Sequence, residues 1–128
     1  MHAVDTNVLV RLVTGDDLTQ AAAAEKFVSA GAWVSHLVLA ETLWVLASLY
    51  DRDAPALAQT VEFLLKHRDL TIQDAEVVVE ALVHYRNRPS LGFSDCLMLE
   101  IARKAGHVPM GTFDRALAKL EGAERIAA

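Results

Sequence analysis

Short apolar segments alternate with helical segments along almost the whole chain, and this alternation constrains the fold more than any other feature. We expect short strands at 2–4, 32–35, 70–72, 108–111 and 125–127. Apolar spacing and glycine stops predict helices at 6–13, 17–29, 37–50, 56–66, 74–86, 93–105 and 114–120. Strands that are separated by helices form a parallel sheet with helices on both of its faces. The pattern therefore predicts an α/β fold.

The composition indicates one domain that spans residues 1–128. Hydrophobic residues make up 53% of the 128 residues, which is enough to fill one sizeable core. Only 3 Pro and 6 Gly are present, and no repeat or low-complexity tract divides the chain. A disordered or linker-rich protein is therefore excluded.

The charge and the cysteine content narrow the function classes. Lys and Arg number 12 against 17 Asp and Glu, so the net charge is −5 and a charge-driven nucleic-acid binder is excluded. The single cysteine, Cys96, excludes an intrachain disulfide and a Cys-based zinc site. The longest uncharged stretch, 27–40, is too short to span a bilayer, and the N-terminus lacks the basic region of a signal peptide. We expect a cytoplasmic protein with no membrane partner.

Three acidic residues lie where a parallel sheet would present them to a ligand. Asp5 follows the first expected strand, Asp114 follows the strand at 108–111, and Asp95 lies in the first turn of the helix at 93–105. Each position also has a simpler explanation. Asp5 and Asp114 could cap helices, and Asp95 could complement the dipole of its helix.

Glu41 is the only charged residue in the expected helix LVLAETLWVLASLY at 37–50. A helix that is apolar on nearly all sides is expected to be buried, and a buried carboxylate needs a cation. No Lys or Arg lies one turn away, because positions 37 and 45 are Leu and Val. The alternative is a narrow polar edge on which Glu41 and Ser48 reach the solvent.

Taken together, these acids predict a metal site. Ligands of parallel sheets bind beyond the carboxyl ends of the strands, so acids that follow strands converge on one edge. Several carboxylates in one pocket cannot all ionise without a counter-charge. A hard divalent cation such as Mg²⁺ takes oxygen ligands and would also bring positive charge to a phosphodiester.

Four segments carry a resemblance to a known family. VDTNVLVRLV at 4–13, SHLVLAETLWVL at 35–46, GFSDCLMLEIA at 92–102 and GTFDRALAKL at 111–120 resemble, in order and spacing, the acidic motifs of PIN-domain ribonucleases. They are most similar to VapC-type toxins of bacterial type II toxin–antitoxin systems. The resemblance implies a PIN-like α/β/α sandwich whose central, mainly parallel sheet has about four to five short strands. It also implies an endoribonuclease dependent on Mg²⁺, with Mn²⁺ as a substitute, and an antitoxin partner.

The resemblance assigns roles to residues. It implies that Asp5, Glu41, Asp95 and Asp114 are the catalytic metal ligands, and that Asn7 and Thr112 are supporting polar residues. In this chemistry a bound metal activates water for attack on the phosphorus of RNA. It further implies a homodimer, with apolar residues of the helices at 17–29 and 37–50 buried against a second copy and the antitoxin. The chain departs from the family pattern at Leu91, Pro109 and Met110, none of which is an acid.

Two other functions compete with the nuclease. A haloacid-dehalogenase-type phosphatase would need a second Asp at position 7, where this chain has Asn. A catalytically silent PIN-like module would act by protein association alone. The other polar or aromatic residues have ordinary roles in our interpretation: scattered histidines (His2, His36, His67, His84, His107), solvated cations or an RNA path (Arg11, Arg86, Arg88, Arg115, Lys119) and core or dimer-interface tryptophans (Trp33, Trp44).

Overall fold

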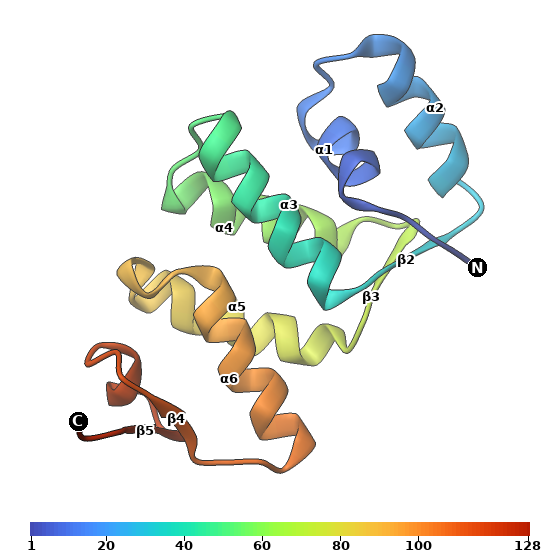
Figure 1. Cartoon of the computed structure of the whole chain (residues 1–128). Coiled ribbons are helices and arrows are strands. Elements are labelled where there is room, and N and C mark those ends of the chain that lie inside the picture. The colour runs from blue at the N-terminus through green and yellow to red at the C-terminus, as the bar shows by residue number, and fades with distance from the viewer. The chain divides into compact units, whose positions relative to one another are not determined.

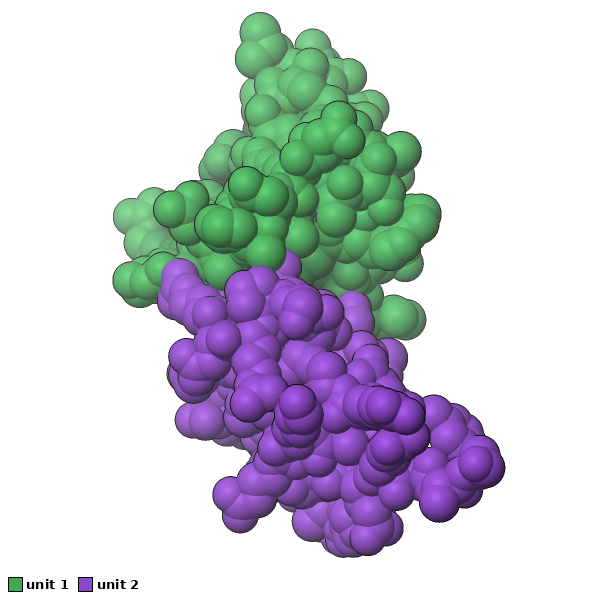
Figure 2. Space-filling view, turned by 90° about the vertical axis from the view of Figure 1, so that its left-hand side faces the viewer, with its two compact units in different colours: residues 1–75 green, residues 76–128 purple.

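A computed structural model describes all residues from 1 to 128 and shows an α/β protein (Figure 1). The elements, in chain order, are β1 (His2–Ala3), α1 (Thr6–Thr14), α2 (Leu18–Val28), β2 (Ala32–Val34), α3 (His36–Leu49), α4 (Ala54–Lys66), β3 (Leu70–Ile72), α5 (Ala75–Asn87), η1 (Pro89–Leu91), α6 (Phe93–Ala105), β4 (Met110–Thr112), η2 (Leu117–Lys119) and β5 (Ala123–Arg125). The chain divides into two compact units, residues 1–75 and 76–128 (Figure 2). We describe each unit by itself, and the expected single domain stays a prediction.

The first unit is built on a three-stranded parallel sheet in the order β1-β2-β3. The register pairs Ala32 with Leu70 and Val34 with Ile72. These four side chains are buried, whereas the residues between them, Trp33 and Thr71, are exposed. The strands therefore show the period of two that strand geometry imposes, with one face in the core.

Side-chain caps define where the helices of the first unit begin. Asp5, Asp17, Ser35 and Asp53 each lie directly before a helix in extended backbone, and each side chain accepts the N–H of the residue three positions on. A cap of this kind satisfies a backbone donor that the helix leaves unpaired. Because capping is local, the predicted starts of these helices agree with the structure to within two residues.

The second unit contains α5, α6 and the parallel pair β4-β5. Its core includes Val78, Ala81, Tyr85, Phe93 and Leu99. The rings of Tyr85 and Phe93 meet edge to face, with their centroids 5.9 Å apart. This geometry suits the quadrupoles of the two rings.

The C-terminal segment differs from the sequence-based expectation. The expected helix at 114–120 is only the 3-10 turn η2, and β5 lies at 123–125 instead of 125–127. Strand β4 begins at Met110 instead of residue 108, because Pro109 has no N–H and the first pairing bond runs from Met110 N to Gly122 O at 2.8 Å. All strand pairs are parallel, as predicted, but the five strands form sheets of three and two.

None of the helices is both long and apolar enough to cross a membrane.

Candidate functional site

Asp5 lies directly after β1 and caps α1. Its Oδ1 accepts the N–H of Val8 at 3.1 Å, and the residue is exposed. The structure thus bears out the simpler role, a cap, which occupies one carboxylate oxygen. The other oxygen, Oδ2, makes no hydrogen bond within the chain and is available to a ligand.

Glu41 corrects one of our expectations. It was predicted to be buried on an all-apolar helix, but it is exposed on α3. The same helix also exposes three large apolar side chains: Leu37, Trp44 and Leu49, which are 75%, 66% and 71% accessible. The helix therefore has a buried face and a solvent-exposed face. Because Glu41 is solvated, its carboxylate does not need a cation to remain ionised. Trp44 is likewise not a core residue.

Asp95 lies in the first turn of α6 and is half-buried. Burial raises the pKa of its carboxyl above the ordinary value, and the negative charge of Asp114 raises the pKa further. The structure therefore brings these two acids of the second unit within electrostatic reach. No basic side chain offsets this repulsion enough to return the pKa of Asp95 to its ordinary value.

Asp114 is held by local hydrogen bonds at the end of β4. Its Oδ1 accepts the N–H groups of Ala116 and Leu117 at 2.8 and 3.1 Å, and its own N–H donates to the Thr112 hydroxyl at 3.0 Å. The Thr112 hydroxyl therefore orients the backbone of Asp114. Asn7, in contrast, is exposed and makes no hydrogen bond within the chain, so its supporting role stays a prediction.

The four predicted acids are divided between the two units. Asp5 and Glu41 belong to the first unit, where no hydrogen bond joins them, whereas Asp95 and Asp114 interact within the second. No group of three or more His, Cys, Asp or Glu side chains is arranged to hold a metal ion. Within each unit, the structure supports only the pair Asp95 and Asp114 as a site.

Arg11 belongs to a network that the sequence did not predict. Its guanidinium donates to Asp16 at 2.8 Å, to Gln20 at 2.7 Å and to the Tyr50 hydroxyl at 3.3 Å. Tyr50 and Thr14 also donate to Asp16, and these bonds, with the one from Tyr50 first, lower the pKa of Asp16 to about 2. Arg11 is thus held in a hydrogen-bonded network and is not a freely solvated cation, while its place on an RNA path stays a prediction.

A buried carboxylate in the second unit was also missed. Glu100 on α6 is only 6% exposed, and both of its oxygens accept from Arg103 Nε, at 3.1 and 3.2 Å. His84 Nε2 lies 3.0 Å from Glu100 Oε2, so it carries a proton if the carboxylate is ionised. One signal could have found the pair of Glu100 and Arg103, because an acid and a base three residues apart on a helix lie on the same face.

Arg103 also connects α6 to the C-terminal segment. Its Nη2 donates to the carbonyl oxygen of Glu121 at 2.6 Å, and its guanidinium lies so close to Gly122 that a Cβ there would be 2.9 Å from Nη1. Gly122 has a φ of +93°, and its carbonyl accepts the first pairing bond of β4. The ion pair of Glu100 and Arg103 therefore holds the strand pair that ends at Thr112, two residues before Asp114.

Comparison with known families matches residues 3–123 to the PIN domain. The chain belongs to the PIN domain family. The match contains all four motif segments, and it leaves no support for the haloacid-dehalogenase alternative. No curated protein matches the chain. PIN domains are generally nucleases that act on RNA and use divalent metal ions.

The acids of the second unit fit a divalent ion as ligands. Asp95 and Asp114 offer carboxylate oxygens, which are the donors that hard cations prefer, and Mg²⁺ binds proteins through as few as one or two carboxylates. Burial first, and the charge of Asp114 second, raise the pKa of Asp95, so its ionised form is disfavoured here in the absence of a cation. A metal bound by this PIN domain would therefore be held by Asp95 and Asp114 in this unit.

We predict that Asp95→Asn does not destabilise the metal-free protein. The pKa of Asp95 is raised in the folded chain, so its ionisation opposes folding, and this cost grows as pH rises through the ordinary value of 3.8. At neutral pH in chelator, the variant should melt at or above the wild-type temperature. Wild type, unlike Asp95→Asn, should gain stability in Mg²⁺ or Mn²⁺, by about 1.4 kcal/mol at a tenfold excess over Kd.

The matched control is Asp53→Asn, an exposed cap of α4 outside the candidate site. It should keep the metal response of wild type. Thermal melting of the three proteins with chelator and with metal checks these results. A clear loss of stability for Asp95→Asn in chelator would show that this acid is structural, and an equal metal response in all three would place the ion elsewhere.

Proposed function

We propose that this PIN domain is a divalent-metal-dependent endoribonuclease that acts as the toxin of a toxin–antitoxin pair. The observation that supports the nuclease activity is the family match over residues 3–123, which includes Asp5, Glu41, Asp95 and Asp114. We propose that these four acids serve one hydrolytic reaction. The resemblance of their segments to VapC-type toxins supports the more specific role.

In the proposed reaction, water attacks the phosphorus of an RNA phosphodiester and the bond to the leaving oxygen breaks. Mg²⁺ or Mn²⁺, when bound, supplies an activated water and charge stabilisation at the leaving oxygen. Asp95 and Asp114 contribute carboxylate oxygens, and the Thr112 hydroxyl holds the backbone of Asp114. Asp5 contributes Oδ2, since its Oδ1 caps α1. Glu41 is exposed, so its carboxylate is accessible to a ligand.

We propose that exposed apolar side chains of α2 and α3 are covered by partners. Leu18 is 83% exposed on α2, and Leu37, Trp44 and Leu49 are exposed on α3. Apolar side chains at this density on a surface are typical of interaction sites. We infer a homodimer and an antitoxin that blocks the acids in the cytoplasm. Light scattering on the purified chain measures its molar mass and so tests the dimer.

The activity is tested by incubating the purified chain with a mixture of cellular RNAs. We expect endonucleolytic fragments in Mg²⁺ and Mn²⁺ and none in excess chelator, because the hydrolysis depends on the metal. Sequencing the fragment ends identifies the cut site. RNA that stays intact in both metals, together with normal binding to a protein partner, would favour the silent binding module.

A further inference from the structure

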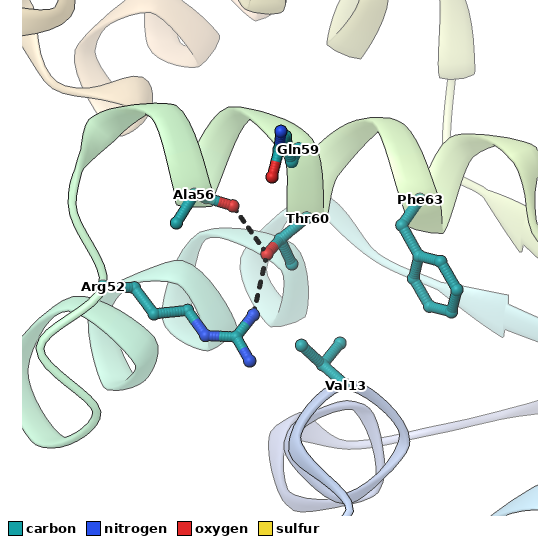
Figure 3. A pocket seen from close by; sticks show the side chains of 6 residues that line it. All are labelled: Val13, Arg52, Ala56, Gln59, Thr60 and Phe63. Carbon is teal, nitrogen blue, oxygen red and sulfur yellow. Dashed lines mark hydrogen bonds between the residues drawn. The ribbon is translucent and has the colours of Figure 1, made fainter.

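A second polar site lies in the first unit, apart from all four acids. A cavity of about 380 Å³ is lined by Val13 at the end of α1, by Arg52, and by four residues of α4: Ala56, Gln59, Thr60 and Phe63 (Figure 3). A cavity of this size falls in the range of ligand pockets. Its lining combines a cation, an amide and an exposed ring with apolar walls.

Arg52 is the only charged residue of this lining, and it has no ion-pair partner in the chain. Its Nη1 donates to the Thr60 hydroxyl at 3.1 Å, and Thr60 donates in turn to the carbonyl of Ala56 at 2.9 Å (Figure 3). Thr60 is buried, so this relay fixes the guanidinium at the cavity. A guanidinium has five N–H groups, and those not used by Thr60 can bind an anion.

The rest of the lining suits a nucleobase. Phe63 is 49% exposed, and its ring lies edge-on to His67 with the centroids 5.7 Å apart. The Gln59 amide offers both donors and an acceptor to the edge of a base. Single-stranded RNA is recognised by stacking on aromatic rings, hydrogen bonds to base edges and cations at the phosphate.

The surrounding charge selects among phosphates. Asp51 and Asp53 flank Arg52 in sequence without forming an ion pair with it, and both are exposed. A terminal phosphate carries nearly two negative charges at neutral pH, whereas a phosphodiester carries one. The two aspartates therefore repel a terminal phosphate more strongly than a phosphodiester. An acidic peptide would satisfy Arg52 but leave the Gln59 amide and the Phe63 ring without a counterpart.

We propose that this cavity binds one internal nucleotide of single-stranded RNA, with Arg52 at the phosphodiester, Phe63 against the base and Gln59 at the base edge. The proposal rests on the ribonuclease function above and adds a substrate-binding subsite to it. The subsite would raise RNA affinity without touching the bond that is cleaved.

The test measures binding of a fluorescent eight-residue oligouridylate to the full chain in excess chelator, so that cleavage does not interfere. Arg52→Met should weaken binding at least about tenfold, because a hydrogen-bonded phosphate contact is lost. The slope of the logarithm of the binding constant against the logarithm of the salt concentration should also become shallower by about 0.7. Phe63→Leu, which keeps the apolar wall, should weaken binding about fivefold or more. Arg52→Lys should restore part of the affinity.

The matched control is Arg68→Met, which removes the same charge from a side chain that is 92% exposed in the same unit. It should change affinity less than twofold. In wild type, the NMR signals of the Arg52 Nε–H and the Gln59 amide should shift as oligouridylate is added. Unchanged RNA affinity in both Arg52→Met and Phe63→Leu would overturn the subsite. So would shifts of these signals with a blocked Leu-Glu-Leu-Glu peptide but not with RNA, which would make the cavity a protein-binding site.

The proposed function is tested separately, because it depends on cleavage in metal and not on binding in chelator. Cleavage by wild type together with normal RNA binding by the two cavity variants would support the nuclease function and overturn the subsite. Loss of binding in the variants of a chain that cleaves nothing would support the subsite and remove the nuclease.

Discussion

Replacement of Asp5 by Asn should lower the rate of RNA cleavage by at least about a hundredfold and leave the fold intact. The amide keeps an oxygen that can accept the N–H of Val8, and Asn is as good an N-cap as Asp. The variant therefore loses the negative charge of the proposed ligand but not the cap of α1. Cleavage of RNA in Mg²⁺, with the melting temperature measured in parallel, checks both parts.

The matched control for this experiment is Asp17→Asn. Asp17 caps α2 by the same kind of hydrogen bond, in which its Oδ1 accepts the N–H of Gln20 at 2.9 Å. Asp17 is not one of the four proposed catalytic acids, so the control should cleave at the wild-type rate. If Asp5→Asn cleaves as fast as this control, Asp5 is only a cap and the proposed active site is wrong.

A large loss of stability is expected from Arg103→Met. The variant leaves Glu100 buried without its main cation, and it also removes the bond to the Glu121 carbonyl. Loss of one partner of a fully buried pair costs ~3–5 kcal/mol. Arg103 is 37% exposed, so solvent screening reduces this, and we expect a loss of about 2–3 kcal/mol in the free energy of unfolding, measured in urea.

Lys104→Met is the matched control for Arg103→Met, because it removes the same charge from the adjacent residue of α6. Lys104 pairs with Glu76 at the surface, where ion pairs contribute at most about 1 kcal/mol. A double variant, Glu100→Met with Arg103→Met, should recover part of the stability, since no buried charge remains. Equal losses in the free energy of unfolding for Arg103→Met and Lys104→Met would show that the buried pair stabilises the fold no more than a surface pair.

The local elements of this protein could be predicted from the sequence. The 3.6-residue spacing of Ala75, Val78, Val79 and Leu82 predicted α5, and the segment Leu-Thr-Ile at 70–72 predicted β3 with the bounds observed. Asp5, considered as a possible cap, also marked the start of α1. These features depend on residues within one or two turns, so the sequence alone is sufficient to predict them. The four acidic segments also predicted the PIN family, which the comparison confirmed.

The sequence determined the type and order of the elements and the family, whereas only the tertiary structure decided which polar groups are buried and which meet. Glu41 looked buried because its own helix is apolar, but what packs on α3 leaves it exposed. Glu100 was not singled out from the sequence, yet it is buried against Arg103 and His84. Arg52 faces a cavity whose walls come from distant positions of the chain. Periodicity and capping are local properties, but burial and electrostatic pairing depend on the elements that pack together, which no local pattern specifies.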